Sequence, residues 1–189
     1  MTKLTGIILA GGKSSRMGTD KGMIDFKGKK LIEYAIEIIS SLVDDIIIIA
    51  NENSYSSLGY KVFKDSIKEI GPLGGIITAL QNTNTEKNII LSCDMPFVNK
   101  GLLQYLINKS EGFDITVPIH NNRTEQLLGV YSKTCLKTFL AQAEKNNLAL
   151  HQANDLMNIN KVAINERCDF WTANLFDNLN NPEDLLNTM

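Results

Sequence analysis

A glycine-rich segment, residues 9–22, carries the most specific chemistry of this chain. It follows an apolar run, residues 4–9, and combines several glycines with two lysines and an arginine. A loop of this composition presents bare backbone N–H groups and fixed cations, and both bind anions. We expect the anion to be a nucleoside triphosphate.

Two common phosphate-binding motifs do not fit the spacing of these glycines. Gly12-Lys13-Ser14 resembles the end of a P-loop, but that motif needs a glycine five residues earlier, where the chain has Ile7. A dinucleotide-binding fingerprint needs G-x-G-x-x-G, whereas the glycines here stand at positions 11, 12 and 18. What remains, L-A-G-G followed by S-R-M-G and D-K, resembles the signature of nucleotidyltransferases that transfer a nucleoside monophosphate to a phosphorylated acceptor.

A carboxylate, Asp94, follows the apolar run at residues 88–93, and Pro96 prevents that strand from continuing. Such a carboxylate can hold Mg²⁺, because phosphate oxygens and water fill the other positions of this ion. The alternative is that Asp94 caps the next helix. Asp65 follows a shorter apolar run, and it either touches ribose, base or metal-bound water or is an exposed turn residue.

Nucleotidyl transfer to a phosphate needs no protein nucleophile, because the attacking oxygen is already ionised near neutral pH. Catalysis is then positioning and charge neutralisation. The chain fits this chemistry, because its residues show no pattern for a nucleophile activated by a base. We expect its two histidines, His120 and His151, to lie outside any cluster at the strand ends. We expect Arg16 and Lys21 to neutralise the phosphates and the leaving pyrophosphate, and we expect Lys13 to be solvated.

The composition indicates one compact domain over residues 1–189, because 43% of the residues are hydrophobic and 21% are charged. A net charge of -2 gives no global field for nucleic acid, so we expect a small ligand. We find no membrane span and no signal peptide, and we expect a cytoplasmic protein. Cys93, Cys135 and Cys168 are far apart and are expected to be buried small hydrophobic residues.

Apolar runs alternate with helical patterns along the chain. Runs that are apolar throughout predict strands buried on both faces, and apolar residues at helical spacing predict helices. The predicted strands are 4–9, 45–50, 60–63, 88–93, 114–118, 127–131 and 161–164, and the predicted helices are 31–42, 73–80, 99–108, 134–157 and a last helix after Pro182. A polar loop is predicted at 120–126. This order predicts an α/β fold with a mostly parallel sheet and helices on both faces.

Ligands of such folds bind at the carboxyl ends of the parallel strands. Polar or glycine residues follow the first four predicted strands: Gly11 and Gly12, Asn51, Asp65 and Asp94. We therefore expect these residues along one edge of the sheet. A second glycine-dense turn, residues 71–75, either starts a helix that packs closely on the sheet or faces the ligand.

Four motifs occur in the order seen in molybdenum cofactor guanylyltransferases, and the resemblance spans nearly the whole chain. They are L-A-G-G-x-x-x-R-M-G-x-D-K, G-P-L-G-G, C-D-M-P-F and the terminal F-D-N-L-N-N-P-E-D-L. The resemblance implies a Rossmann-like three-layer sandwich of the nucleotide-diphospho-sugar transferase type. It also implies GTP and molybdopterin as ligands, Mg²⁺ as cofactor, and other molybdenum-cofactor proteins as partners. The reaction would transfer GMP to the terminal phosphate of molybdopterin and release pyrophosphate.

The resemblance also implies site residues. The nucleotide site carries over to Leu9, Ala10, Gly11, Gly12, Lys21, Asn51 and Asp65, the magnesium ligand to Asp94, and a pterin-side element to Asn178, Asn180 and Pro182. Two positions depart from the family's pattern: Asn181 stands where threonine is usual, and Gly74 replaces a frequent alanine.

Three alternatives stay open at this stage. A related transferase could use CTP on molybdopterin, or one could activate a sugar phosphate, because the first motif is shared among these enzymes. A nucleotide-binding regulator without turnover is the third, and the set of Arg16, Lys21 and Asp94 argues against it.

Overall fold

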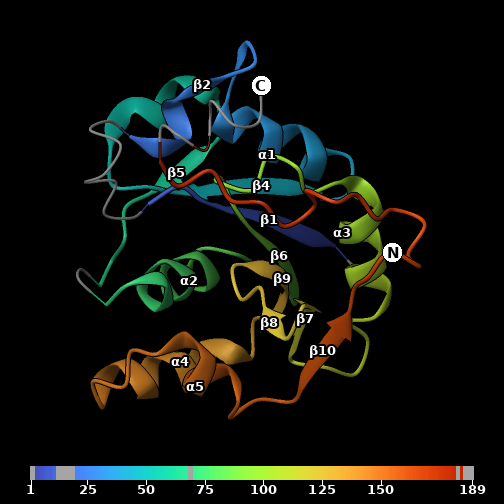
Figure 1. Ribbon diagram of the computed structural model, residues 1–189. Coiled ribbons are helices and arrows are strands. Elements are labelled where there is room, and N and C mark those ends of the chain that lie inside the picture. The colour runs from blue at the N-terminus through green and yellow to red at the C-terminus, as the bar shows by residue number, and fades with distance from the viewer. Residues whose placement is uncertain (1–2, 12–19, 68–69, 182–183, 185–189) are drawn as a thin grey trace.

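The structure, a computed structural model, describes residues 3–11, 20–67, 70–181 and 184. The elements along the chain are β1 (Leu4–Leu9), η1 (Lys21–Met23), β2 (Asp25–Phe26), β3 (Lys29–Lys30), α1 (Leu31–Ser40), β4 (Asp45–Ile49), η2 (Asn53–Leu58), β5 (Lys61–Phe63), α2 (Pro72–Gln81), β6 (Lys87–Ser92), α3 (Lys100–Asn108), β7 (Ile115–His120), β8 (Arg123–Thr124), β9 (Leu128–Ser132), α4 (Cys135–Glu144), α5 (Leu150–Asn154) and β10 (Ile159–Ala163). Helices α1 and α3 cover one face of the main sheet, and α2, α4 and α5 cover the other (Figure 1). The predicted three-layer α/β sandwich is confirmed.

The main sheet has the strand order β10-β7-β9-β6-β1-β4-β5, and β8 pairs with the outer part of β7. Strand β9 runs antiparallel to both of its neighbours, β6 and β7, while the other pairs along this path are parallel. Six strands of this path therefore point the same way and end at one edge. The predicted, mostly parallel sheet is confirmed.

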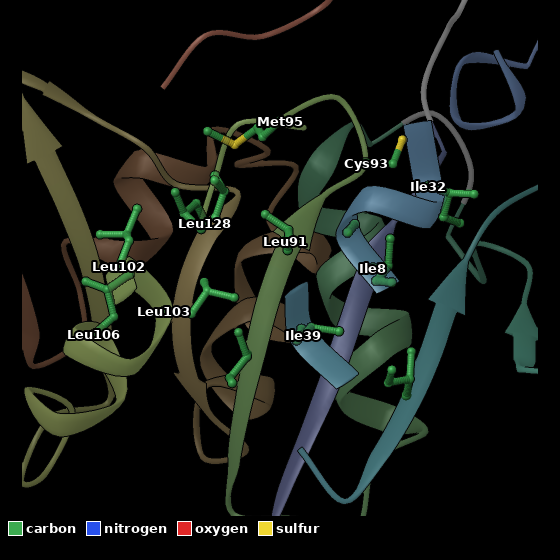
Figure 2. Packing of buried hydrophobic residues seen from close by; sticks show 14 of the residues in the cluster. Ile8, Ile32, Ile39, Leu91, Cys93, Met95, Leu102, Leu103, Leu106 and Leu128 are labelled. Carbon is green, nitrogen blue, oxygen red and sulfur yellow. The ribbon is translucent and has the colours of Figure 1, made fainter. Parts of the chain in front are cut away.

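Strand β1 shows why apolar runs form the centre of this sheet. Successive side chains of a strand point to opposite faces, so Ile7 packs in the core beneath α2, whereas Ile8 packs in the core beneath α1. Figure 2 shows this second core, where Ile8, Ile39 and Leu91 lie close together. Gly6 allows the close approach, because a Cβ there would stand 2.9 Å from Ile39 Cδ1.

Side chains and turn residues set the starts of the helices. Asn99 caps α3, since its Oδ1 accepts a hydrogen bond from Leu102 N at 3.0 Å. Glu33 Oε2 accepts from Lys30 N at 2.6 Å at the start of α1. Gly71, with φ of 64°, precedes Pro72 at the first position of α2. Among the described helices, none has both the length and the apolar composition that crossing a membrane requires.

The helical region predicted over 134–157 is divided into two helices, α4 and α5. Asn146 has a φ of 56°, and Asn147 N donates to Gln142 O at 2.9 Å, which ends α4. A left-handed residue interrupts a helix without changing the apolar periodicity around it. The last helix, predicted after Pro182, lies outside the described residues apart from Asp184.

The polar loop predicted over 120–126 is wrong in part. His120 is the last residue of β7, and β8 follows it as the second strand of a hairpin. The two-residue turn is made by Asn121 and Asn122, with φ of 48° and 62°. The turn type that matches the twist of hairpin strands requires a positive φ at both central residues, and asparagine tolerates this conformation.

Candidate active site

The carboxyl ends of the parallel strands bring the predicted residues into one row. Following the strand order from β5, the row is Asp65, Asn51, Gly11, Asp94, His120 and Asn165, located at or just after the ends of β5, β4, β1, β6, β7 and β10. The amino end of the antiparallel strand β9 reaches the same edge between β6 and β7. The expected alignment of Gly11, Asn51, Asp65 and Asp94 along one edge is therefore confirmed, while Gly12 lies outside the described residues.

The centre of this row is an ion pair between segments far apart in the sequence. Lys21 Nζ donates to Asp94 Oδ2 at 2.7 Å and to Asn180 Oδ1 at 2.7 Å. The side chains of Lys21 and Asp94 are only 16% and 18% exposed, so bulk water screens this pair weakly. Asp94 does not cap the helix that follows, since Asn99 does so. A cation and a carboxylate thus lie together where a phosphate and its metal ion can bind.

A second contact set fixes the position of Lys21. The Asp20 carboxylate accepts hydrogen bonds from the Tyr55 hydroxyl and, at 2.8 Å, from Ser54 Oγ. Burial, followed by the Asp20 carboxylate, raises the pKa of Tyr55 above its usual range, so the hydroxyl stays a donor. Gly22 is required beside it, because a Cβ there would lie 2.6 Å from the Tyr55 oxygen. Helix η2 therefore clamps the start of η1, which presents Lys21.

Asp94 and Asn180 are fixed by backbone contacts and packing. Leu179 N donates to Asp94 O at 2.9 Å, and the buried Leu179 side chain packs with Phe26 and Leu31. This anchors the C-terminal segment beside the end of β6. Cys93 lies directly behind Asp94, and burial raises the pKa of its thiol to about 12. It is a neutral packing residue, as predicted. Of the other two cysteines, Cys135 is buried and Cys168 is half-buried.

Backbone hydrogen bonds and burial fix the end of β1 as far as Ala10, the residue before the exposed Gly11. Leu9 and Ala10 are buried, Leu9 O accepts from Cys93 N at 3.1 Å, and Ala10 N donates to Ile49 O at 2.9 Å. Gly11 is exposed and begins the glycine-rich loop. The predicted roles of Gly12 and Arg16 fall outside the described residues, as does Lys13.

Asn51 and Asp65 are neighbours on the β4 and β5 side of Gly11. Asn51 is exposed, and its Oδ1 accepts from Asp65 N at 3.2 Å. Asp65 Oδ1 accepts from Ile67 N at 3.2 Å and from Thr78 Oγ1 at 3.3 Å. Asp65 therefore shapes the loop after β5. Its predicted contact with a nucleotide stays a prediction.

The second glycine-dense turn has a packing role in this structure. A Cβ on Gly74 would lie 2.7 Å from Ile67 O and 2.9 Å from Asp65 Oδ1. Gly75 is also buried, and a Cβ there would make an ordinary contact of 3.6 Å with Leu9 Cδ2. The glycine at position 74 therefore allows α2 to approach the loop that carries Asp65.

His120 is the functional candidate that the sequence interpretation missed. The sequence predicts it outside any strand-end cluster, and this prediction is wrong, because His120 ends β7 at the same edge as Asp94. Its ring centroid lies 4.9 Å from that of Trp171 and 5.2 Å from that of Phe176. The alternating pattern before His120 would have extended the strand to it if the Asn121-Asn122 turn had been read as a hairpin signal.

The C-terminal segment contributes further to this side of the site. Asn178 Oδ1 is buried and has no hydrogen-bond partner within the part of the chain that the structure describes. Asn181 Oδ1 accepts from Asp184 N at 3.0 Å, and Asp184 Oδ2 accepts in return from Asn181 N at 3.0 Å. Asn181 and Asp184 thus satisfy each other's backbone N–H groups. Pro182 lies outside the described residues.

The comparisons with known proteins agree with this geometry. The family model of the MobA-like NTP transferase domain matches residues 6–158. A "probable molybdenum cofactor guanylyltransferase" of Flavobacterium johnsoniae is 42% identical over 151 residues, which are 79% of this chain and 80% of that protein. A protein of the same name from Natranaerobius thermophilus is 34% identical over 191 residues, covering 96% of this chain and 93% of the relative. Both alignments support one family.

A solved structure shows the same fold. The crystal structure of molybdopterin-guanine dinucleotide biosynthesis protein A from Archaeoglobus fulgidus superposes with a TM-score of 0.81. The match covers 97% of this chain and 95% of that chain, at 23% sequence identity.

Proposed function

The chain belongs to the MobA-like NTP transferase family and is a nucleotidyltransferase, and we propose that it transfers GMP from GTP to the terminal phosphate of molybdopterin. The products would be molybdopterin guanine dinucleotide and pyrophosphate. The family expected from the motifs is confirmed. The observation that carries the proposed chemistry is the Lys21–Asp94 pair, joined at 2.7 Å at the carboxyl edge of the sheet.

The reaction requires charge neutralisation more than proton transfer. An ionised phosphate oxygen of the acceptor attacks the α-phosphorus of GTP, the bond from this phosphorus to the bridging oxygen breaks, and pyrophosphate leaves. Lys21 is placed to stabilise the charge that develops on the phosphate oxygens, because it lies in a weakly solvated site and is held from two sides. Arg16 and the N–H groups of Gly11 and Gly12 are proposed to bind the triphosphate.

Asp94 fits the role of the magnesium ligand that we propose. Mg²⁺ binds hard oxygen ligands and usually keeps water and phosphate oxygens, so one protein carboxylate can suffice. Among the described residues, no three or more histidine, cysteine or acidic side chains lie together so that they could hold a metal ion, and a metal held by substrate phosphates and Asp94 needs no such group. When bound, Mg²⁺ would neutralise phosphate charge and polarise the reacting phosphoryl group.

The remaining assignments follow from position in the row. Leu9 and Ala10, which are fixed by backbone hydrogen bonds, are proposed to position the start of the glycine-rich loop, and Asn51 and Asp65 are proposed to face the nucleoside. Asn178 and Asn180 are proposed to face the acceptor, since their segment lies on the other side of Asp94. We infer that the chain works as a single domain over residues 1–189. Because GTP is its substrate, we place the reaction in the cytoplasm.

The test is a comparison of nucleotides and acceptors. Pyrophosphate release is measured with GTP, CTP, ATP or UTP, each with Mg²⁺, with and without molybdopterin. We expect GTP to exceed CTP by at least about 100-fold in kcat/KM, because a site built to pair with one base leaves polar groups unpaired with another. Preferential use of CTP would assign the chain to cytidylyl transfer, and turnover with a sugar phosphate but not with molybdopterin would refute the proposal.

A further inference from the structure

A cleft of about 690 Å³ opens at the β7 and β10 end of the same sheet edge. Its lining includes His120 and Trp171, the turn residues Asn121 and Asn122, and Asn165 and Glu166, which follow β10. Small-molecule sites commonly have about this volume, at roughly 300–1,000 Å³. The residues assigned above to the nucleotide and its phosphates do not line it.

One wall of the cleft belongs to a cluster of three aromatic rings. The His120 ring stacks on Phe176, with ring centroids 5.2 Å apart and an interplanar angle of 17°, and Trp171 packs beside both rings, at 4.9 Å from His120 and 6.3 Å from Phe176. His120 and Trp171 line the cleft. Hydrogen bonds fix the His120 ring as well: Nδ1 lies 3.2 Å from Ile164 O, and Nε2 lies 2.8 Å from Asn121 Nδ2. A carbonyl oxygen only accepts, so Nδ1 is the donor to Ile164 O.

The rim of the cleft favours a neutral heterocycle over a phosphate. Glu166 brings a carboxylate to the rim, and Glu125 lies near His120. Arg123, a nearby cation, is paired with Glu125 at 2.9 Å. Carboxylates repel phosphate but accept hydrogen bonds from adjacent ring N–H and amino groups. The amides of Asn121 and Asn165 supply further polar groups beside the rings.

The position of the cleft assigns it to the acceptor half of the site. Strand β7 is two strands from β6, which puts His120 about 10 Å from Asp94, since neighbouring strands lie about 4.8 Å apart. The nucleotide loops after β1 and β4 lie on the other side of Asp94. One segment links the two places: Phe176 stacks on His120, Leu179 N bonds Asp94 O, and Asn180 bonds Lys21. Figure 1 shows this segment, in red, crossing the molecule after β10.

We infer that this cleft binds the pterin ring of the acceptor, with Trp171 and His120 as the stacking surface. This inference rests on the proposed function. The acceptor's phosphate would then reach toward Lys21 and Asp94. Guanine presents the same edge of ring N–H and amino groups as a pterin. The place of the cleft, across Asp94 from the loop that follows β1, favours the pterin.

Trp171 is the single tryptophan of the chain, so its fluorescence reports on the cleft directly. The chain is titrated with 6-hydroxymethylpterin, without nucleotide, and emission is corrected with free N-acetyltryptophanamide. GMP is titrated in parallel as the guanine source. We expect saturable quenching by the pterin, weakened at least about tenfold by His120→Ala, because stacking on an aromatic side chain contributes this much. His151→Ala, at the other histidine of the chain, is the matched control and should leave the affinity unchanged.

Steady-state kinetics provide the second readout. Trp171→Leu should raise the KM for molybdopterin at least about tenfold, while the KM for GTP stays within about twofold. Trp171→Phe keeps a ring and should restore most of the affinity, which excludes a folding defect as the cause.

The outcomes separate this inference from the proposed function. A chain that shows no turnover of GTP and molybdopterin refutes the proposed function, yet pterin quenching still decides the role of the cleft. Absence of pterin quenching, equal quenching by GMP, or an unchanged KM for molybdopterin in both Trp171→Leu and His120→Ala would overturn the inference.

Discussion

Replacing Lys21 with methionine tests the centre of the site, because it removes the charge and keeps most of the length of the side chain. In this structure Lys21 Nζ bonds both Asp94 and Asn180 at 2.7 Å. The substitution therefore removes a cation from the phosphates and also removes the bridge that Lys21 makes between the side chains of Asp94 and Asn180. These two losses affect different measurements.

The catalytic loss should be the larger of the two. Removing one preorganised donor to a developing negative charge costs about 2.7–4 kcal/mol, or a 100- to 1,000-fold decrease in kcat/KM. The loss of stability should be smaller. An exposed ion pair contributes up to about 1 kcal/mol, and breaking a buried one costs about 3–5 kcal/mol. The Lys21 and Asp94 side chains are 16% and 18% exposed, so the cost of breaking this pair should be intermediate. We expect about 1–2 kcal/mol, which lowers the Tm by roughly 2–8 °C.

The assay is pyrophosphate release with GTP and molybdopterin, together with thermal unfolding of the same preparations. Lys29→Met is the matched control, since Lys29 pairs with Glu37 at 2.6 Å but both side chains are at least half exposed, at 50% and 66%. It should change kcat/KM less than about twofold. If Lys21→Met folds normally and keeps kcat/KM within about threefold of wild type, under 0.7 kcal/mol on the barrier, then Lys21 does not act on the phosphates.

Three further predictions concern the metal ligand, the sheet and a buried carboxylate. Asp94→Asn should lower kcat/KM at least about 100-fold at an unchanged fold, and activity within about threefold of wild type would remove Asp94 from the mechanism. Gly129→Ala should lower the free energy of unfolding by about 1–3 kcal/mol in urea titrations, because its Cβ would lie 2.5 Å from Thr116 O, whereas Gly75→Ala should cost less than this; equal losses would contradict the packing argument. Burial raises the pKa of Glu125 above its usual 4.5, so the folded state binds more protons than the unfolded state, and stability falls as the pH rises from about 4.5 through the folded pKa. Glu125→Gln should therefore gain stability relative to wild type between pH 4 and pH 7, and a difference that does not grow with pH would refute this.

The strands at the centre of the sheet could be predicted nearly to the residue. The predicted strands 4–9, 45–50 and 88–93 agree with β1, β4 and β6 to within one residue at either end. These strands are covered on both faces, so their sequences are apolar throughout and leave little doubt about type or length. Elements whose ends depend on single backbone conformations could not be predicted, as the left-handed Asn146 between α4 and α5 shows.

The site could be predicted where it depends on topology and not where it depends on long-range contacts. Gly11, Asn51 and Asp94 line one edge because parallel strands end together. The contact of Lys21 with Asn180 joins residues 159 positions apart, and nothing in the sequence around either residue indicates the other as its partner. His120 was missed because the Asn121-Asn122 turn, which lets β7 run to its end, was interpreted as part of a polar loop.

The contacts of Lys21 also indicate how the two halves of the site are joined. In this structure its ammonium is bound by the carboxylate of Asp94, just after β6, and by an amide of the C-terminal segment, so phosphate oxygens that bind it must add to or replace these partners. The same segment carries Phe176, which stacks on His120 in the cleft. Residues 176–180 therefore border both the cleft and the phosphate site. Because Leu179 packs with Phe26 and Leu31, this short stretch is anchored between the two contacts, which keeps the proposed pterin and phosphate sites at a fixed separation.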